Sequence, residues 1–274
     1  MEHKKIAFIG GGNMGRALVK GLVSSGYPAD LITVADLGAD KLEAIASDFG
    51  VRVTQSNAEA ASWADALVLA VKPQVMAEAL GKLTQDIGSY GDKTIISLAA
   101  GVSVSRLTGL MNGHTRIVRL MPNTPALIGE GATGAFASAG ISESEKQFVS
   151  GILNAVGKSV WVEKEEDINA VTAASGSAPA YFFLLMQYMT EKAVEMGLSK
   201  EAASTLISQT ALGSAKMVLA NPDTPLETLR AQVTSKGGTT FAAITSFEQA
   251  NLKKAVSDAM DACSARASEM QSLF

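Results

Sequence analysis

The sequence feature that most constrains this chain is a glycine pattern that directly follows a short apolar run near its start. The run, Ile6–Ile9, is expected to form a central parallel strand that is buried on both faces. Gly10, Gly12 and Gly15 then give Gly-x-Gly-x-x-Gly. In this pattern the first glycine permits a tight turn, the second lets a pyrophosphate approach the backbone, and the third lets the next helix pack against the strand.

A helix predicted over residues 13–25 completes the pattern. Its N-terminal amides and its dipole would hold phosphate groups. Because the glycines follow a strand and open a helix, they have the context that a dinucleotide-binding site requires. The alternative is a glycine-rich turn in an unrelated α/β protein.

The composition argues against several other functional classes. The net charge is −4 and the sequence has no basic stripe, which argues against nucleic-acid binding. Cys263 is the only cysteine, so an internal disulfide is excluded and the chain suits a reducing compartment. Because the only histidines are His3 and His114, no metal site is predicted.

The sequence predicts no targeting or membrane segment. The glycines cut the first apolar run to four residues, which is shorter than the roughly 7–15 apolar residues of a signal sequence. The longest later apolar run, residues 178–186, falls short of the roughly 18 residues needed to cross a bilayer. A soluble, cytoplasmic protein is therefore expected.

The first part of the chain alternates between strand and helix patterns. After the first strand, further strands are expected at residues 31–35, 51–54, 65–71, 94–98, 116–120 and 160–162. A capping box at residues 142–145 opens one of the intervening helices. This alternation predicts an α/β fold with an N-terminal Rossmann-type, doubly wound parallel sheet over residues 1–162.

Asp36 is the candidate residue for cofactor selection. It ends the second predicted strand, about 20 residues past the glycines, where an acid can accept hydrogen bonds from the adenosine ribose. A carboxylate there favours NAD over NADP, because it repels a 2′-phosphate. The alternative is an ordinary loop acid close to Asp40, and Lys41 could still reach a phosphate.

Three further strand ends carry candidate ligand-binding groups. Ligands of open α/β folds bind beyond the carboxyl ends of the strands. Lys72 and Pro73 follow one strand, and the small residues 97–101 follow the next and leave room for a flat ring. Asn123 and Thr124 follow a third strand, in a rigid loop with two prolines, and are expected to present neutral hydrogen-bonding groups. The alternative for residues 97–101 is that they only pack a helix.

From residue 163 onward the sequence predicts helices alone, at residues 167–175, 178–197, 199–220, 239–249 and 251–271. The helix at 178–197 is apolar on all sides, so it must be buried in a large core or against another subunit. A helical substrate and dimerisation domain over residues 163–274, and a homodimer, are therefore expected. The acidic run at 163–167 is interpreted as a solvated boundary, with Glu165 as a candidate functional residue.

A second chemical motif lies at residues 233–240, Val-Thr-Ser-Lys-Gly-Gly-Thr-Thr. Gly237 and Gly238 precede a predicted helix, so consecutive amides and a helix N-terminus could hold a carboxylate or a phosphate. Four hydroxyl groups are added by Thr234, Ser235, Thr239 and Thr240. The alternative is a flexible turn with Thr239 as a helix cap. The polar break that ends in Ser177 is expected to face the same cleft.

Taken together, these motifs resemble the Δ1-pyrroline-5-carboxylate reductase family over essentially the whole chain. The resemblance rests on five segments: residues 8–15, 70–73, 121–125, 175–181 and 233–240. The last segment is the most specific. Ala178 departs mildly from the pattern, because family members usually have glycine or serine there.

The resemblance implies roles for individual residues. Gly10, Gly12, Asn13, Met14, Gly15 and Asn57 would contact the adenosine and pyrophosphate side of the cofactor, and Ala70, Val71, Lys72, Pro73, Ala99, Ala100 and Gly101 would flank the nicotinamide. The segment Gly238-Thr239-Thr240 would hold the substrate, often across a dimer with interlocked C-terminal helices. Family members usually prefer NADPH and often accept NADH, and a ring of dimers is a family expectation. Asp36 is where this chain differs from several members.

The implied reaction is the NAD(P)H-dependent reduction of a cyclic imine to L-proline, the last step of proline biosynthesis. Thr240 is the candidate partner of the ring nitrogen, while Ser235, Gly237, Gly238, Thr239, Glu165 and Ser177 are the other candidate substrate-binding residues. One alternative is a hydroxy-acid dehydrogenase that uses Lys192 or Lys216 as a base. Another is a sensor that binds NADP without catalysis.

Overall fold

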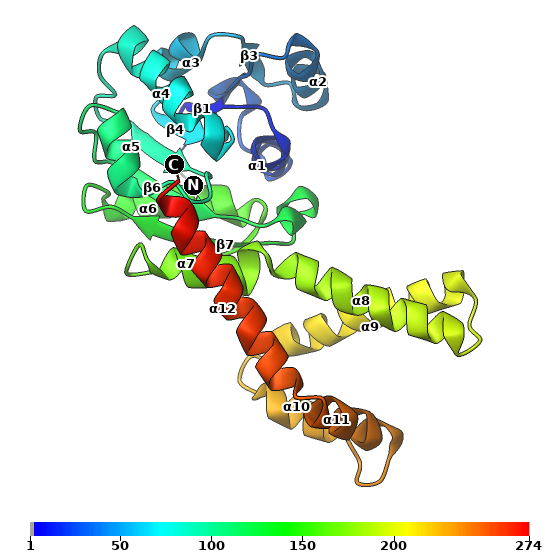
Figure 1. The fold of residues 1–274 in the computed structure, drawn as a ribbon. Coiled ribbons are helices and arrows are strands. Elements are labelled where there is room, and N and C mark those ends of the chain that lie inside the picture. The colour runs from blue at the N-terminus through cyan, green and yellow to red at the C-terminus, as the bar shows by residue number, and fades with distance from the viewer. Residues whose placement is uncertain (1–2, 274) are drawn as a thin grey trace. The chain divides into compact units, whose positions relative to one another are not determined.

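The computed structural model describes residues 3–273. The first part of the chain alternates between strands and helices as predicted (Figure 1). Its strands are β1 (Ile6–Ile9), β2 (Ile32–Ala35), β3 (Arg52–Thr54), β4 (Ala66–Leu69), β5 (Thr94–Ser97), β6 (Ile117–Met121), β7 (Gly131–Ala137) and β8 (Gly157–Trp161). Its helices are α1 (Asn13–Ser24), α2 (Ala39–Phe49), α3 (Asn57–Trp63), α4 (Pro73–Ile87), α5 (Val104–Leu110) and α6 (Glu143–Asn154).

The strands form one eight-stranded sheet in the order β3-β2-β1-β4-β5-β6-β7-β8. The six strands from β3 to β6 are parallel, as expected for a Rossmann-type sheet. β7 runs antiparallel to β6, and β8 runs parallel to β7. The predicted fold class is therefore confirmed, but the sheet is not parallel throughout.

β7 was not predicted from the sequence. Its sequence, GATGAFA, has two glycines and three alanines and no alternation of large apolar residues, so it lacks the usual strand signal. The structure shows why a small residue is needed at Gly134. A Cβ atom there would lie 2.4 Å from Val171 Cγ1, so this glycine lets the helix Asp167–Val171 approach the strand closely.

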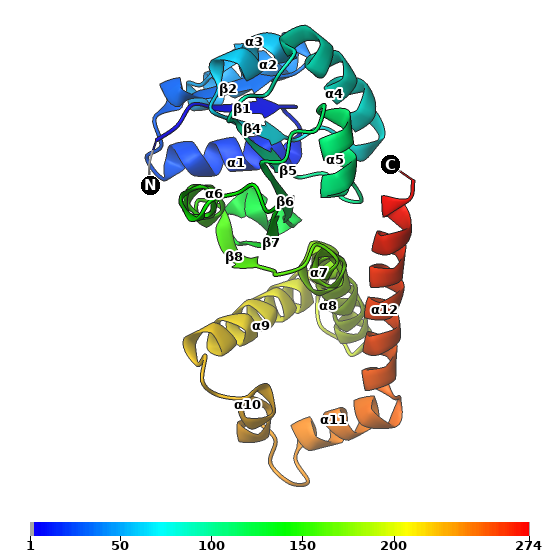
Figure 2. The same cartoon turned by 90° about the vertical axis from the view of Figure 1, so that its left-hand side faces the viewer.

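Helices cover both faces of the sheet (Figure 2). On one face, α1 and α6 contribute Leu18 and Phe148 to a buried cluster with Phe8. On the other face, α4 and α5 contribute residues such as Met76 to a second cluster with Leu67. Because strand residues from both faces are fully buried, the central strands are apolar runs rather than alternating patterns.

The predicted capping box opens α6. The Ser142 side chain accepts a hydrogen bond from the Glu145 amide, and Glu145 accepts one from the Ser142 amide. Glu145 Oε1 also accepts hydrogen bonds from Thr94 Oγ1 at 2.6 Å and Arg116 Nη2 at 2.9 Å. Burial acts to raise the pKa of Glu145, but these hydrogen bonds outweigh it and lower the pKa to about 2.

The remainder of the chain is helical among the described residues, as predicted. It comprises α7 (Asp167–Val171), a π-helical turn (Thr172–Gly176), α8 (Ala178–Glu195), α9 (Lys200–Ala220), α10 (Leu226–Gln232), α11 (Thr239–Gln249) and α12 (Leu252–Gln271). The predicted helix at 167–175 is interrupted by the π turn, and α10 was not predicted. α8 and α9 pack against each other (Figure 1).

Contacts divide the chain into two compact units. The first unit ends at Ser177 and also includes the residues from Ala262 onward, and the second unit is Ala178–Asp261. This division differs from the predicted one after Val162. The physical reason is the close packing of α7 on β7, which places α7 with the sheet. The end of α12 also belongs to the first unit, where Gln271 Nε2 donates a hydrogen bond to Asn169 Oδ1 at 2.9 Å.

Within the second unit, α8 exposes an apolar surface. Phe182, Phe183 and Tyr188 are 64%, 61% and 57% exposed. Among the described residues, one helical stretch, Asp167–Glu195, is long and apolar enough by length and composition to cross a membrane. The π turn interrupts the stretch, and its C-terminal end carries Glu191, Lys192 and Glu195.

Candidate active site

The glycine loop after β1 contains two glycines that the fold itself requires. Gly10 has φ +106°, and a Cβ atom there would lie 2.9 Å from the Ala70 backbone. A Cβ atom on Gly15 would lie 2.7 Å from the Gly10 carbonyl oxygen. Side chains at either position would push apart β1, β4 and α1.

Gly12 differs from these two glycines. Its φ is −69°, and a Cβ atom there would have the Ala70 carbonyl oxygen, at 4.0 Å, as its nearest neighbour. The fold would therefore accept a side chain at Gly12. Space that the protein leaves open beside a helix N-terminus is where a bound pyrophosphate would approach the backbone.

The start of α1 offers unpaired amides beside that space. Gly12 is the N-cap residue and provides no side-chain cap, so the first-turn amides of Asn13 and Met14 lack partners within the helix. Such amides, together with the helix dipole, suit a phosphate group. The residues that the sequence analysis assigned to the pyrophosphate thus lie together.

A cavity of about 550 Å³ borders the glycine loop. Gly10, Asp36, Asn57 and Val71 all line it, so four predicted cofactor residues from separate segments meet here. Its apolar wall includes Leu83 of α4. The volume falls in the range of about 300–1,000 Å³ that is typical of ligand pockets, and the mixed lining fits a nucleoside.

Asp36 follows β2 as predicted and is held by three groups. Its Oδ2 accepts a hydrogen bond from the Gly11 amide at 2.8 Å, and its Oδ1 accepts one from the Gly38 amide at 3.0 Å. Lys41 Nζ lies 2.9 and 2.8 Å from the two oxygens. Burial acts to raise the pKa of Asp36, but the hydrogen bonds outweigh it, so the pKa lies below its ordinary value.

The ends of β4 and β5 form the adjoining rim of the sheet. The Leu98 amide donates a hydrogen bond to the Leu69 carbonyl at 3.1 Å, which places the segment that contains Ala99, Ala100 and Gly101 beside the segment at residues 70–73. Pro73 is the first residue of α4, with Lys72 as its N-cap. The residues predicted to flank a nicotinamide are therefore neighbours.

In the second unit, the loop at residues 235–240 has the predicted form. Gly237 has φ +76°, and the Gly238 amide donates to the Ser235 carbonyl at 3.0 Å. A Cβ atom on Gly238 would lie 2.6 Å from Ser235 Oγ. Gly238, not Thr239, is the N-cap of α11. Among the described residues, no hydrogen bond engages the half-buried Thr240 hydroxyl.

Comparisons with known proteins agree with this arrangement. Residues 165–270 match a family model described as pyrroline-5-carboxylate reductase dimerisation, and residues 5–101 match one described as NADP oxidoreductase coenzyme F420-dependent. A pyrroline-5-carboxylate reductase from Vibrio alginolyticus is 50% identical over 274 residues, which covers 100% of both chains. One from Pseudomonas aeruginosa is 44% identical and covers 98% of both. The chain belongs to the pyrroline-5-carboxylate reductase family.

Solved structures of pyrroline-5-carboxylate reductases share the fold. The structure from Coxiella burnetii has a TM-score of 0.93 and 41% identity, and the match covers 98% of this chain and 99% of that one. A Plasmodium falciparum pyrroline carboxylate reductase with NADP bound has a TM-score of 0.85 and 29% identity, and covers 99% of both chains. The open space at Gly12 and the cavity beside it fit such a dinucleotide.

In this member of the pyrroline-5-carboxylate reductase family, the Asn123 side chain makes contacts within the protein that the sequence did not predict. Its side chain is 8% exposed and both its polar atoms are engaged within the protein. Nδ2 donates to the Ser175 carbonyl at 3.1 Å, and Oδ1 accepts from the Ala132 amide at 2.9 Å. The side chain thus links segments of the protein, which the sequence did not predict, and a contact with the cofactor stays a prediction.

Glu165 is likewise not a solvated boundary residue. Its Oε1 accepts hydrogen bonds from Arg119 Nη1 and from the Val104 amide, each at 2.8 Å. The Arg119 side chain is 3% exposed. Arg119 was not among the predicted site residues, although an arginine inside the apolar strand Ile-Val-Arg-Leu-Met signals a buried ion pair. Glu165 thus ties β6 to the start of α5, and a substrate contact remains a prediction.

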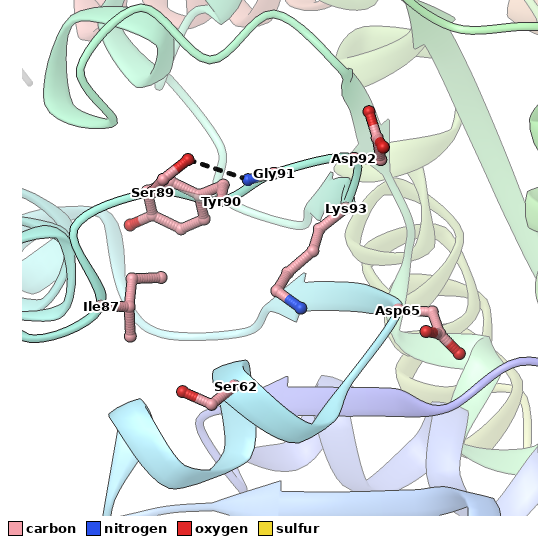
Figure 3. A pocket seen from close by; sticks show the side chains of 8 residues that line it. All are labelled: Ser62, Asp65, Ile87, Ser89, Tyr90, Gly91, Asp92 and Lys93. Atoms are coloured by element: carbon pink, nitrogen blue, oxygen red, sulfur yellow. Dashed lines mark hydrogen bonds between the residues drawn. The ribbon is translucent and has the colours of Figure 1, made fainter.

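The structure also has a cavity of about 440 Å³ away from these residues (Figure 3). Asp65 and Lys93, which line it, directly precede β4 and β5, so the cavity lies at the amino ends of the strands. Lys93 Nζ donates a hydrogen bond to the Ala64 carbonyl. This cavity is at the opposite edge of the sheet from the glycine loop, where ligands of such folds do not usually bind.

Proposed function

We propose that this protein catalyses the NAD(P)H-dependent reduction of 1-pyrroline-5-carboxylate to L-proline, the last step of proline biosynthesis from glutamate. The observation that carries the proposal is the loop at 235–240. It forms a glycine turn and a helix start with an available hydroxyl, in a chain that matches reductases of this name over its full length.

The residues divide the chemistry as follows. With its pyrophosphate bound at the glycine loop, the reduced cofactor would supply a hydride to the imine carbon, and the hydride's two electrons would form the new C–H bond. The amides at Gly237 and Thr239 bind the substrate carboxylate beside the helix start, since the Gly238 amide already donates to the Ser235 carbonyl. The Thr240 hydroxyl accepts a hydrogen bond from the protonated ring nitrogen and so orients the imine.

Lys192, one of the two lysines that could act as the base of a hydroxy-acid dehydrogenase, lacks the surroundings that such a base needs. Lys192 Nζ pairs with Glu195 at 2.8 Å on an exposed helix face. This hydrogen bond raises the pKa of Lys192, whereas a lysine base needs a lowered pKa. A hydroxy-acid dehydrogenase is therefore the weaker candidate.

For the cofactor, we propose NADPH, with NADH also accepted. The Asp36 carboxylate alone would repel a 2′-phosphate, but Lys41 neutralises it and is half-exposed, so the lysine can turn toward a phosphate. If Lys41 stays on Asp36, the carboxylate can instead bind the ribose hydroxyls of NADH.

The deciding experiment is the steady-state oxidation of NADPH and of NADH, with pyrroline-5-carboxylate as the only acceptor. Rapid oxidation of either cofactor is expected. An NADPH preference would assign Lys41 to the 2′-phosphate, while a large NADH preference would make Asp36 a ribose ligand. A folded protein that binds a cofactor but oxidises neither would refute the reductase assignment.

Gly12→Ala is expected to weaken NADPH binding roughly 10- to 100-fold, because the added methyl group overpacks the pyrophosphate site by about 1–3 kcal/mol. The fold should be unaffected, since the nearest protein atom to that methyl group is 4.0 Å away. Fluorescence titration measures the binding and thermal unfolding measures the fold. Gly81→Ala, on α4 with open space around it, is the control. Unchanged NADPH affinity in Gly12→Ala would place the pyrophosphate elsewhere.

We also propose a homodimer formed through the second unit, which can in turn assemble into a ring of dimers. The support is the apolar surface of α8, together with the match of residues 165–270 to the dimerisation model. Light scattering should give at least twice the 28.4 kDa mass of one chain, and Phe183→Asp should reduce it. A wild-type monomer at micromolar concentration would contradict the proposal, and recovery in the membrane fraction would favour a bilayer instead.

A further inference from the structure

The π-helical turn between α7 and α8 leaves one carbonyl group in need of a partner. The Ser177 amide donates to the Thr172 carbonyl at 2.8 Å, five residues back, which closes the turn. In a regular helix the Ser175 carbonyl would accept a hydrogen bond from the amide of residue 179. That residue is Pro179, which has no amide hydrogen.

Asn123 supplies the missing donor. Its Nδ2 donates to the Ser175 carbonyl at 3.1 Å, while its Oδ1 accepts from the Ala132 amide at 2.9 Å. One buried amide therefore links three segments: the loop after β6, the start of β7 and the π turn. This role needs a donor and an acceptor on one short side chain, and asparagine provides both.

Packing holds the same segments together. A Cβ atom on Gly176 would lie 2.5 Å from Met121 Cε, so the π turn rests directly on the end of β6. The end of β6 is at the carboxyl edge of the sheet, where ligands of this fold class bind. π turns of this kind frequently occur at functional sites.

We propose that Asn123 is a positioning residue of the reductase. It donates the hydrogen bond that Pro179 cannot donate, and so fixes the Ser175–Ser177 turn at the carboxyl edge of the sheet, where the substrate would bind. The proposal rests on the proposed function. It assigns Asn123 to the placement of the imine substrate and not to contact with the cofactor.

Asn123→Asp tests this assignment, because aspartate keeps the acceptor for Ala132 but turns an oxygen toward the Ser175 carbonyl. We expect kcat/KM for pyrroline-5-carboxylate to fall about tenfold or more, chiefly through KM. The Kd for NADPH, titrated without substrate, should change less than about twofold. Asn154→Asp, at an exposed asparagine of α6, is the matched control and should behave as wild type.

Pro179→Ala is the decisive second variant, since it restores an amide at position 179 that can donate a hydrogen bond to the Ser175 carbonyl. In the Pro179→Ala variant, we expect the additional Asn123→Asp change to lower kcat/KM by less than about threefold. The wild-type protein, the two single variants and the double variant also form a double-mutant cycle in urea denaturation, which should show coupling between the two positions. If Asn123→Asp prevents folding, Pro179→Ala must restore a folded protein.

Several results would overturn the proposal. A tenfold weaker Kd for NADPH with unchanged KM would make Asn123 a cofactor ligand. An equal cost of Asn123→Asp in both backgrounds, or failure to fold in both, would show that the amide does not serve the Ser175 carbonyl. If the wild-type protein does not reduce pyrroline-5-carboxylate, the proposed function fails by itself, and the urea cycle still reports whether Asn123 and Pro179 are coupled.

Discussion

Glu165→Ala is expected to lower the free energy of unfolding by about 3–5 kcal/mol, because it leaves a buried arginine without a counter-charge. Arg119 lies in the central part of the sheet with a side chain that is 3% exposed, and the only acceptor found for it among the described residues is Glu165. The same change removes the acceptor of the Val104 amide. Because domains are stable by only about 5–15 kcal/mol, this loss is large.

Urea denaturation at neutral pH measures this effect, and the chain offers a close control. Glu163 belongs to the same acidic run but is exposed, so Glu163→Ala should change stability by less than about 0.5 kcal/mol. Combining Glu165→Ala with Arg119→Met should recover part of the loss, since it removes the unpaired charge. If Glu165→Ala were as stable as the control, the ion pair would not contribute to the fold.

Thr240→Ala is expected to lower kcat/KM for pyrroline-5-carboxylate about 100-fold, near the low end of the range for groups that take part in proton transfer. The hydroxyl is a poor acid by pKa, so its loss should remove orientation of the imine and not the proton source itself. The effect should appear mainly in kcat. NADPH affinity should be unchanged, because the glycine loop is not altered.

Thr240→Ser separates the hydroxyl from the rest of the side chain. Serine keeps the oxygen at the start of α11, so we expect activity within about tenfold of wild type. Steady-state kinetics at saturating NADPH give both constants for the two variants. Equal activity of Thr240→Ala and the wild-type protein would assign the ring nitrogen to another group, with solvent water as the first candidate.

The sequence was sufficient for the parts of the site that depend on local backbone chemistry. Gly10 and Gly15 have distinct steric tasks that a single pattern encodes, and the helix after Gly238 begins where its turn chemistry predicts. Such features depend on neighbours in the chain, so they can be deduced without knowing the tertiary fold.

Features that depend on distant partners were missed. Glu165 resembles a surface acid when only its acidic neighbours are considered, and its partner Arg119 is 46 residues away in the chain. Asn123 follows a strand as a ligand-binding residue would, yet its two partners, Ala132 and Ser175, come from a strand without a strand signal and from a π turn. Long-range pairs of this kind leave no periodic pattern in the sequence.

The division of the chain into two units affects the order in which parts of the protein can fold during synthesis. The first unit contains both the early residues and those from Ala262 onward, so the second unit is an insertion within it. During synthesis α12 is made after every other described element, and domains fold as they emerge. The sheet can therefore form early, but the contact of Gln271 with Asn169 must wait until α12 has been made. Removal of the last turns of α12 would consequently affect the unit whose first residues are synthesised earliest.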